Sequence, residues 1–380
     1  MEQSTTEHWY NKHYKHLLVL PGLLLLFSLV YLGMFYSAHG DLFLKDVSLS
    51  GGTVITVFDT DFTPTQVAEA LASTFPDAHI RAISDIRTGA QKAFYVESSA
   101  SAEELRPVLE ALIGYSLTSI NSSTEFSGAV LSQQFYRQLL QALAVAFLLM
   151  ALVVFVIFSQ DKTLKAWAIM LTLGSTAALL PGIRSVSTLC VLGIACAGIY
   201  GMFFGKGKRW IVFALMLFSF VLPSLVGNQF WIIGVVTGVL FGGYAYYSVP
   251  SAAVVFAAFA DIVMTLVVVN LMGMHMSVGG IIALLMLIGY SVDTDILLTT
   301  RVLKERVGTV NERMWGACKT GVTMTMTAIV AVGISLVFVH SFSDTLSQIF
   351  TIMLIGLGFD LLNKWITNAS ILKWFVERQA

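Results

Sequence analysis

Long apolar runs separated by short polar links dominate this 380-residue sequence. A helix needs about 20 apolar residues to span the hydrocarbon core of a bilayer. Ten segments are close to that length, at approximately 17–36, 137–158, 165–183, 186–204, 210–226, 229–247, 251–272, 278–299, 320–339 and 348–370. Charged residues make up only 12% of the chain, against about 25% in soluble domains. We therefore expect a polytopic α-helical membrane protein with about ten spans.

The distribution of lysine and arginine predicts the orientation of these spans. If the N-terminus lies in the cytoplasm, nearly all basic residues outside 37–137 fall on cytoplasmic segments, and Arg184 is the exception among the short outer loops. The first apolar run exceeds the 7–15 residues typical of a signal peptide, which favours an uncleaved anchor. We predict a multi-pass protein of the cell membrane with both termini cytoplasmic and residues 37–136 outside.

Residues 37–136 are the one region able to build a water-soluble core. Thr63-Pro-Thr-Gln66 and Ser101-Ala-Glu-Glu104 are capping boxes that open helices to about residues 74 and 113. Strand-like stretches lie at 53–58, 78–84, 93–98 and 116–121. The order β-α-β-β-α-β is typical of a ferredoxin-like α+β domain. This domain contains no nucleophile–base pair or ligand cluster, which favours a binding or mechanical role over catalysis.

Composition argues against several other classes of function. The net charge of −1 and the lack of a basic face argue against a nucleic-acid partner. Cys190, Cys196 and Cys318 have no metal-ligand spacing, so we expect no metal and no cofactor. An intramembrane enzyme would need His or Ser beside an acid at membrane depth. The only His residues after position 79 are at predicted outer loops, and we therefore expect no enzymatic activity.

Four carboxylates lie inside predicted spans: Asp261, Asp293, Asp295 and Asp360. A charge near the centre of the bilayer costs at least roughly 2.5–3.5 kcal/mol, so such residues are usually paired, protonated or functional. Asp293 and Asp295 point roughly 200° apart on a helix, so both cannot face one narrow pathway. We expect Asp293 to face inward because it lies deeper in its span.

Each carboxylate also has a purely structural interpretation. Asp295 would reach the cytoplasmic surface beside Arg301, and Asp360 would form a neutralising i,i+4 pair with Lys364. Asp261 has no basic residue in its own span and must find a partner elsewhere or carry a proton. A proton relay through Asp261 and Asp293 is the functional hypothesis. The nearby threonines 320, 323, 325 and 327 are expected to hydrogen-bond across helices, with a hydrated path as the alternative.

Four sequence motifs together resemble the SecF family of protein-export membrane proteins, archaeal type, within the RND superfamily. They are Ser48-Leu-Ser-Gly-Gly-Thr-Val54, Phe259-Ala-Asp-Ile-Val-Met-Thr265, Ile288-Gly-Tyr-Ser-Val-Asp-Thr-Asp-Ile-Leu-Leu-Thr-Thr-Arg301 and Gly358-Phe-Asp-Leu-Leu-Asn363. The resemblance covers about 1–158 and 248–380. Its motif residues are Gly51, Gly52, Gly289, Tyr290, Ser291 and Arg301.

This resemblance implies an accessory subunit of the Sec translocase. Such a subunit acts in the lipid bilayer with a SecD-like subunit and a SecY-type channel to promote export of unfolded polypeptides, with a proton or ion gradient as its energy source. Six core spans are expected, so 159–247 is an inserted block of about four spans. The expected domains are 1–36 (tail and first span), 37–136 (exported domain), 137–158 (second core span), 159–247, and 248–380 with a cytoplasmic loop at 301–318.

Two departures from the bacterial pattern bear on the relay. Bacterial members have Asn-Asp-Thr where this chain has Asp293-Thr294-Asp295, and their fifth-span Arg aligns with Lys319. The candidate relay residues are therefore Asp261, Asp293, Asp295, Lys319 and Asp360. The alternative function is an RND-type exporter of small molecules or lipids, although such pumps generally carry two large exported domains and this chain carries one.

Overall fold

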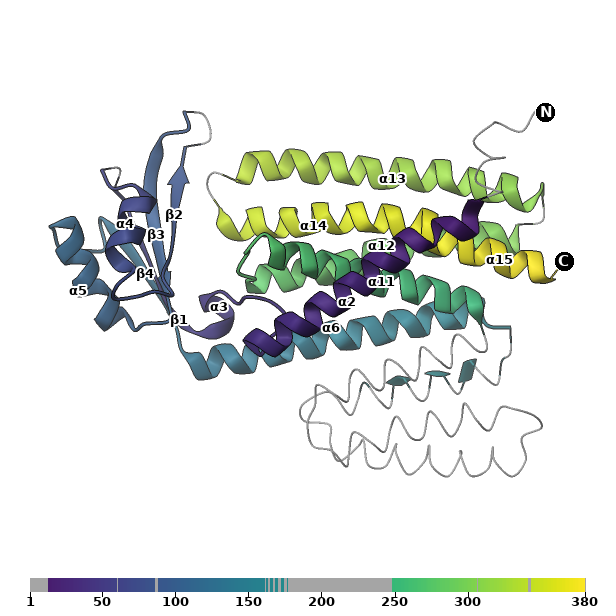
Figure 1. The fold of residues 1–380 in the computed structure, drawn as a ribbon, viewed down its shortest axis with the longest axis horizontal. Coiled ribbons are helices and arrows are strands. Elements are labelled where there is room, and N and C mark those ends of the chain that lie inside the picture. Colours follow the sequence, from purple (N-terminus) through teal and green to yellow (C-terminus); the bar gives the residue numbers. More distant parts are fainter. Residues whose placement is uncertain are drawn as a thin grey trace, which may run out of the picture.

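The computed structural model describes residues 13–59, 61–85, 88–160, 248–305, 307–340 and 343–379, together with 162, 165–166, 168–169, 172–173 and 176. These residues form a bundle of long helices with a small sheet domain at one end (Figure 1). Among the described residues, six helices are long and apolar enough to cross a membrane: His13–His39, Ala129–Phe158, Val249–Leu271, Val278–Lys304, Val310–Val339 and Asp344–Arg378. The start of α2 (Val19–His39) lies at the far end of the bundle from the sheet, as does the C-terminus.

The other helices of the bundle are α6 (Ala129–Phe158), α11 (Val249–Leu271), α12 (Val278–Lys304), α13 (Val310–Val339) and α14 (Asp344–Leu362). A π-helix η1 (Asn363–Asn368) and α15 (Ala369–Gln379) continue α14 toward the C-terminus. The six predicted spans outside 159–247 each coincide with one of the candidate spans. The four spans predicted between 165 and 247 lie almost entirely outside the described residues.

Helix α11 occupies the centre of the bundle. In its most apolar stretch 78% of the residues are buried, against 11% for α13. Small residues such as Ala253, Ala257 and Ala260 lie on its buried surface and allow neighbouring helices to approach closely. Any polar side chain on this surface is consequently enclosed by α2, α6, α12 and α14.

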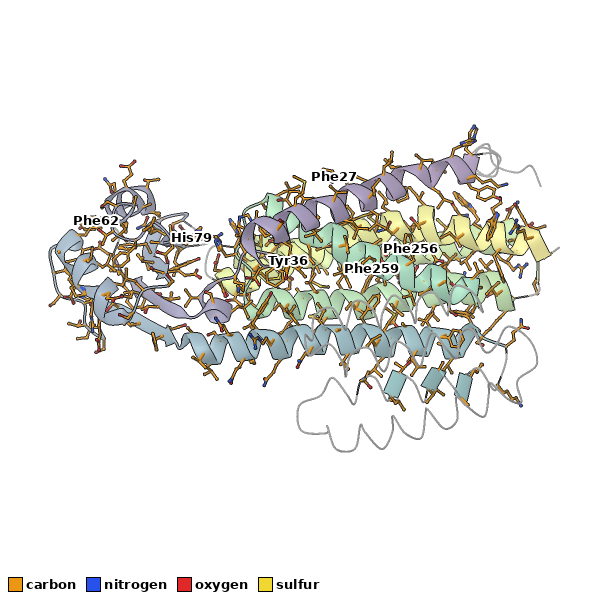
Figure 2. All side chains as sticks on the ribbon, turned by 60° about the horizontal axis from the view of Figure 1, so that its bottom comes forward. Phe27, Tyr36, Phe62, His79, Phe256 and Phe259 are labelled. Carbon is orange, nitrogen blue, oxygen red and sulfur yellow. The ribbon has the colours of Figure 1, made fainter. Side chains whose placement is uncertain are left out.

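Large apolar side chains remain exposed on the outer helices. Phe27 on α2 is 56% exposed, and Val337 on α13 is 72% exposed; Figure 2 shows Phe27 on the outer surface of the bundle. A soluble protein rarely exposes such continuous apolar surface. This surface suits contact with lipid.

The loop between α12 and α13 is shorter than predicted. We expected a cytoplasmic loop over 301–318, but α12 continues to Lys304 and α13 begins at Val310. Thr309 and Glu312 form a capping box at the start of α13. The hydropathy criterion finds only the apolar part of a helix, and it missed the polar ends of these two.

The sheet domain contains β1 (Gly52–Val57), α4 (Pro64–Leu71), β2 (His79–Ser84), β3 (Gln91–Ser98), α5 (Ala102–Ile113) and β4 (Ser122–Ser127). The strand order is β2-β3-β1-β4, and all neighbouring strands are antiparallel. Both predicted capping boxes are formed. Both helices pack on one face of the sheet through a shared apolar core, and the other face is turned toward the bundle (Figure 1).

The last strand lies later in the chain than we predicted. Residues 116–118 have no regular structure, residues 119–121 form a turn, and β4 begins at Ser122. The side chain of Asn121 accepts a hydrogen bond from the backbone N–H of Thr118 at 2.6 Å. The N–H groups of Asn121 and Ser122 both donate to the carbonyl of Thr118. Asn commonly stabilises such turns, and this turn displaces the strand by six residues.

Two glycines hold the sheet domain close to the bundle. Gly51 and Gly52 connect the short helix α3 (Val47–Ser50) to β1, with φ angles of +85° and +142°. A Cβ atom on Gly51 would lie 2.4 Å from the Cα of Ala129, the first residue of α6. A Cβ on Gly52 would lie 2.3 Å from the carbonyl oxygen of Ser98. Both chain connections between domain and bundle therefore meet at a point where only glycine fits.

The opposite edge of the sheet contacts the bundle through side chains. Asp344, the first residue of α14, accepts hydrogen bonds from Arg81 at 2.7 Å and from the Tyr95 hydroxyl at 2.6 Å. The rings of His79 and His275 lie 3.8 Å apart between centroids, and Figure 2 shows His79 at the boundary between domain and bundle. The domain is thus tethered at one edge and held by polar contacts at the other.

Candidate functional site: a buried charge network in the bundle

A network of buried polar side chains lies inside the bundle. It is contributed by α11, α12 and the helix that runs through α14 and η1. Its members are at most 4% exposed: Asp261, Ser291, Asp295, Asp360, Asn363, Lys364, Thr367 and Asn368. Buried polar groups on this scale are costly unless they are hydrogen-bonded or paired.

Asp261 lies midway along the central helix α11. One carboxylate oxygen, Oδ2, accepts a hydrogen bond from the Ser291 hydroxyl at 2.8 Å. The other, Oδ1, accepts one from the side-chain amide of Asn363 at 2.8 Å. Asp261 thereby links α11 to α12 and to the C-terminal helix. Its own span contains no basic residue, and its hydrogen-bond donors come from two other helices.

Lys364 and Asp360 form an ion pair in the interior of the bundle. Lys364 Nζ lies 2.5 Å from Asp360 Oδ2, and both side chains are 0% exposed. The i,i+4 pair expected from the sequence is therefore present. The second oxygen of Asp360, Oδ1, is buried without a hydrogen-bond partner among the described residues.

Asp295 occupies the inward position that we assigned to Asp293. Asp295 is 0% exposed, and its Oδ1 accepts a hydrogen bond from Asn368 at 2.8 Å. Asp293 is exposed on the outer side of α12, so the prediction from depth was wrong. Depth along a helix does not determine rotation about its axis, and α12 buries Ser291, Asp295 and Leu298 on one face.

The surface position considered for Asp295 is also wrong. That interpretation put the carboxylate beside Arg301, but Arg301 is paired with Glu305, at 3.9 Å, and Asp295 is buried. Asp295 instead lies close enough to Lys364 for the two charges to interact. Its second oxygen, Oδ2, is buried and has no hydrogen-bond partner in the part of the chain that the structure describes.

The π-helix η1 supplies one partner to each buried carboxylate in the network. Asn363 binds Asp261, Lys364 binds Asp360, and Asn368 binds Asp295. π-Helical turns occur frequently at functional sites. Sequence reasoning did not assign a role to Asn363 or Asn368. The available signal was the resemblance motif ending at Asn363, which we used only to identify the family.

The network holds more negative than positive charge. Three carboxylates, Asp261, Asp295 and Asp360, face one ammonium group, that of Lys364. An uncompensated buried charge is strongly unfavourable, so the network favours uptake of protons or small cations. The unpartnered oxygens of Asp295 and Asp360 offer acceptors for them. Chemically, these two oxygens are acceptors for a proton while Lys364 remains paired with Asp360.

Other predicted site residues lie outside this network. Lys319 is exposed on α13, as Asp293 is on α12. In the family motif, a Cβ on Gly289 would meet no atom within 4 Å, and the hydroxyl of Tyr290 is buried without a described partner.

The threonines of α13 were expected to hydrogen-bond across helices. The hydroxyls of residues 320, 323 and 327 instead donate to backbone carbonyls of their own helix. Hydroxyl groups in helix interiors often bond back to the preceding turn in this way. Thr325 is buried, and its hydroxyl has no partner among the described residues.

These features define a multi-pass helical membrane protein with a small antiparallel sheet domain and charged side chains in its interior. Residues 214–378 match the family described as protein export membrane protein SecD/SecF, C-terminal. All members of the buried network lie within this range. The C-terminal part of the chain is thus similar in sequence to the SecD/SecF export proteins.

Several archaeal proteins named protein-export membrane protein SecF are similar to this chain. The protein of Methanothermobacter thermautotrophicus is 50% identical over 132 residues, which cover 34% of this chain and 46% of that protein. That of Methanolacinia petrolearia is 40% identical over 179 residues, covering 47% and 58%. That of Methanocaldococcus jannaschii is 39% identical over 177 residues, covering 46% and 56%. The chain spans about half the length of the curated relatives it matches.

A solved structure shares the fold. The crystal structure of SecDF, a translocon-associated membrane protein from Thermus thermophilus, superposes with a TM-score of 0.53 at 13% identity. The match covers 97% of this chain and 38% of that chain. The fold is therefore of the SecDF type.

Proposed function

We propose that this chain is an accessory subunit of the Sec protein translocase, which promotes protein export across the cytoplasmic membrane. The names of its relatives support this role. The observation that carries the proposal is the buried network of Asp261, Asp295, Asp360 and Lys364 within the matched region. Interior charges of this kind in membrane proteins mark ion or proton pathways.

The ion gradient acts through the excess negative charge of the network. A proton or cation that binds at Asp295 or Asp261 lowers the repulsion among the three carboxylates. It also lowers the negative charge that Lys364 has to compensate. Its release restores that repulsion and favours a different packing of α12 against the C-terminal helix. Since α14 carries Asp360 in its interior and Asp344 at the sheet domain, a shift of this helix reaches the domain directly.

The architecture of the exported part follows from the same proposal. We infer a ferredoxin-like domain over 37–136 on the outer side of the membrane, supported by the strand order β2-β3-β1-β4. Cytoplasmic termini are supported by the charge distribution and by the position of α15 and the start of α2 at the end of the bundle away from the sheet. The even number of four further spans proposed in 159–247 preserves this orientation. We retain a total of ten spans.

The partners proposed are a SecD-like subunit, a SecY-type channel and unfolded exported polypeptides. Two charged side chains inside candidate spans, Asp293 and Lys319, are exposed on the surface of the bundle. Exposure of such charges to lipid is unfavourable, which supports a second membrane subunit in contact with the bundle. The SecDF chain also extends well beyond the part that this chain matches.

The test is protein export into membrane vesicles with and without an imposed proton or sodium gradient. We expect Asp295→Asn and Asp261→Asn to abolish the stimulation by the gradient while leaving export at the basal rate. Asn keeps the size and part of the hydrogen bonding of Asp but cannot carry the charge. Export that remains fully gradient-stimulated in both variants would disprove the proposed coupling, and export unchanged by deletion of the whole subunit would disprove the accessory role.

A further inference from the structure

The sequence contains two Asn-x-Ser triplets, which are the acceptor pattern for N-linked glycosylation. They are Asn121-Ser-Ser123 in the sheet domain and Asn368-Ala-Ser370 at the junction of η1 and α15. The structure separates the two clearly. Asn368 and Ser370 are 0% exposed, and the Asn368 amide is bound to Asp295 inside the bundle. The folded chain therefore offers only the first triplet to a modifying enzyme.

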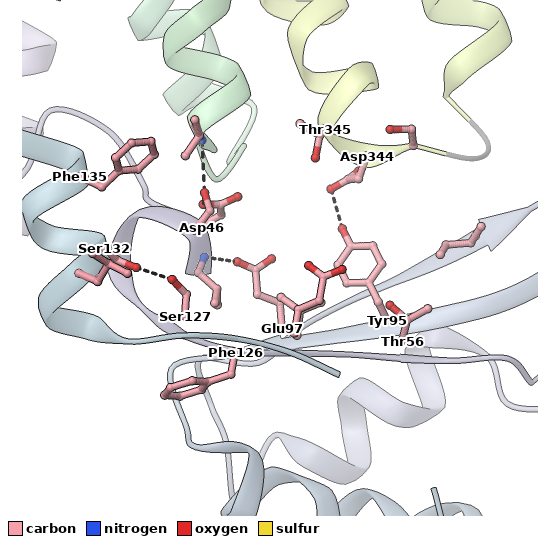
Figure 3. A pocket seen from close by; sticks show the side chains of 18 of the residues that line it. Asp46, Thr56, Tyr95, Glu97, Phe126, Ser127, Ser132, Phe135, Asp344 and Thr345 are labelled. Atoms are coloured by element: carbon pink, nitrogen blue, oxygen red, sulfur yellow. Dashed lines mark hydrogen bonds between the residues drawn. The ribbon is translucent and has the colours of Figure 1, made fainter. Parts of the chain in front are cut away.

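The first triplet lies on the surface of the sheet domain. Asn121 ends the turn between α5 and β4, and residues 118–120 of this segment are exposed. Ser123 is also exposed and lies opposite Thr56 in the register of β4 and β1. Residues directly opposite each other share one face of a sheet, and Thr56 lines the cavity of about 780 Å³ between the sheet and the bundle (Figure 3). The Ser123 hydroxyl is thus on the face that α4 and α5 leave open.

The hydrogen bonds of Asn121 are compatible with a sugar on its amide nitrogen. Nδ2 donates to the carbonyl of Ser116 at 3.0 Å, and Oδ1 accepts from the backbone N–H of Thr118 at 2.6 Å. The amide nitrogen carries two hydrogens. A sugar replaces one of them, and the other can still donate to Ser116. The turn therefore keeps both of these bonds when Asn121 is modified.

Strand β4 separates this turn from the point where the domain joins the bundle. The strand runs from the turn to Ser127, close to the start of α6. At about 3.3 Å per residue, its six residues place Asn121 about 20 Å along the sheet from α6. A bulky group on Asn121 consequently leaves the attachment of the domain undisturbed.

Large apolar side chains are exposed around the same turn. Ile120 is 89% exposed, Phe58 54% and Tyr115 37%. The N–H of Phe58 donates to the carbonyl of Asn121 at 2.9 Å, and the hydroxyl of Tyr115 donates to Asp59, the residue after Phe58. Apolar surface that gathers on a water-facing domain marks a site that another group covers. A glycan is bulky and solubilising, so a glycan on Asn121 would shield this surface from water.

We propose that Asn121 is N-glycosylated on the outer side of the membrane. The donor is a sugar joined through phosphate to a membrane lipid, and a transferase brings it to the triplet. Nδ2 forms a bond to the anomeric carbon of the sugar, and the bond from that carbon to the phosphate oxygen breaks. The lipid phosphate leaves with the electron pair, and a base of the transferase takes the amide proton. The inference rests on the proposed placement of residues 37–136 outside the membrane and not on the export role.

The test is peptide mass spectrometry of the full-length chain purified from membranes of the cells that naturally produce it. We expect the peptide that contains Asn121 to carry added mass in whole sugar units, with the attachment at Asn121. The peptide that contains Asn368 is an internal control and should have no added mass. An Asn121 peptide found only without sugar, or sugar on Asn368, would overturn the proposal.

Two substitutions of Ser123 form a matched pair. Ser123→Ala removes the hydroxyl that the acceptor pattern requires and leaves the bonds of Asn121 in place, so we expect the added mass to be lost. Ser123→Thr keeps the pattern and should retain the added mass. Asn121→Gln should also lose it, but this change removes the side chain that holds the turn, which is why the Ser123 pair decides. Added mass that persists in Ser123→Ala would assign the modification to another residue.

A labelling experiment separates this inference from the proposed orientation. Ala111 is exposed on α5, and Ala111→Cys in intact cells should react with a maleimide that does not cross membranes, above the background of the unsubstituted chain. Labelling together with an unmodified Asn121 would overturn glycosylation and leave the orientation intact. Loss of both labelling and sugar would overturn the orientation as well. Because no export is measured, neither result bears on the gradient test.

Discussion

The ion pair between Asp360 and Lys364 provides the sharpest test of the buried network. Both side chains are 0% exposed and their charged atoms are 2.5 Å apart. Removing one partner of such a pair leaves an uncompensated buried charge, at a cost of about 3–5 kcal/mol. Replacing both partners by apolar residues of similar size is often close to neutral. The double variant should therefore be more stable than the sum of the single variants predicts.

The surroundings make the two single substitutions unequal. Lys364→Met leaves three carboxylates with no cation, and we expect it to reduce the free energy of unfolding by about 3–5 kcal/mol. Asp360→Leu leaves Lys364 within reach of the charge of Asp295, so the ammonium retains a partner. We expect Asp360→Leu to be clearly the less destabilising of the two.

The assay is a double-mutant cycle measured by detergent-induced unfolding of the purified chain, followed by circular dichroism. The expected coupling free energy between the two sites is at least about 2 kcal/mol. Glu305→Gln is a suitable control, because the exposed Glu305 and Arg301 are 3.9 Å apart and such pairs contribute at most about 1 kcal/mol. Additive single substitutions, or an Asp360→Leu variant less stable than Lys364→Met, would refute the reasoning.

Three further predictions concern the sheet domain and a helix end. Gly51→Ala should destabilise attachment of the sheet domain by about 1–3 kcal/mol, because φ is +85° and the new methyl group would overlap Ala129. A Cβ on Gly128 would meet no atom within 4 Å, so Gly128→Ala is the control. Limited proteolysis should cleave the domain faster in Gly51→Ala than in Gly128→Ala, and equal protease sensitivity of the two variants would contradict this. The pKa of Asp46 is raised to about 6 by burial from 3.8 in the unfolded chain, so its stabilising contribution is present below pH 3.8 and is lost as the pH rises through 6. Asp46→Asn should accordingly gain stability relative to the wild type between pH 5 and pH 7.5, as measured by urea unfolding, and a constant difference would exclude this. Thr309→Ala should reduce stability by about 1 kcal/mol through loss of the helix cap, whereas Thr309→Ser should not, as thermal unfolding would show.

The sequence by itself determined the class of protein and most of its local structure. Apolar runs located six helices that the structure contains. A helix needs about 20 apolar residues to cross a bilayer, and an apolar run of that length is rarely required elsewhere in a protein. The capping boxes at Thr63 and Ser101 identified two helix starts because each satisfies backbone donors within four residues. The resemblance motifs indicated the same family whose model matches residues 214–378, and they include Asp261, Asp295, Asp360 and Asn363 of the buried network.

The tertiary structure alone decided which charges meet. Rotation of α12 brought Asp295 inward and left Asp293 outside, and this rotation depends on packing against α6, α11, α13 and α14. Neither the length of the apolar run nor the depth of a residue in the span predicts the rotation of α12 about its axis, because apolar residues occur on all sides of a membrane helix. The same holds for Asn363 and Asn368, whose amides reach carboxylates 102 and 73 residues away in the sequence. Long-range contacts of this kind depend on how the helices pack, and local sequence patterns do not predict them.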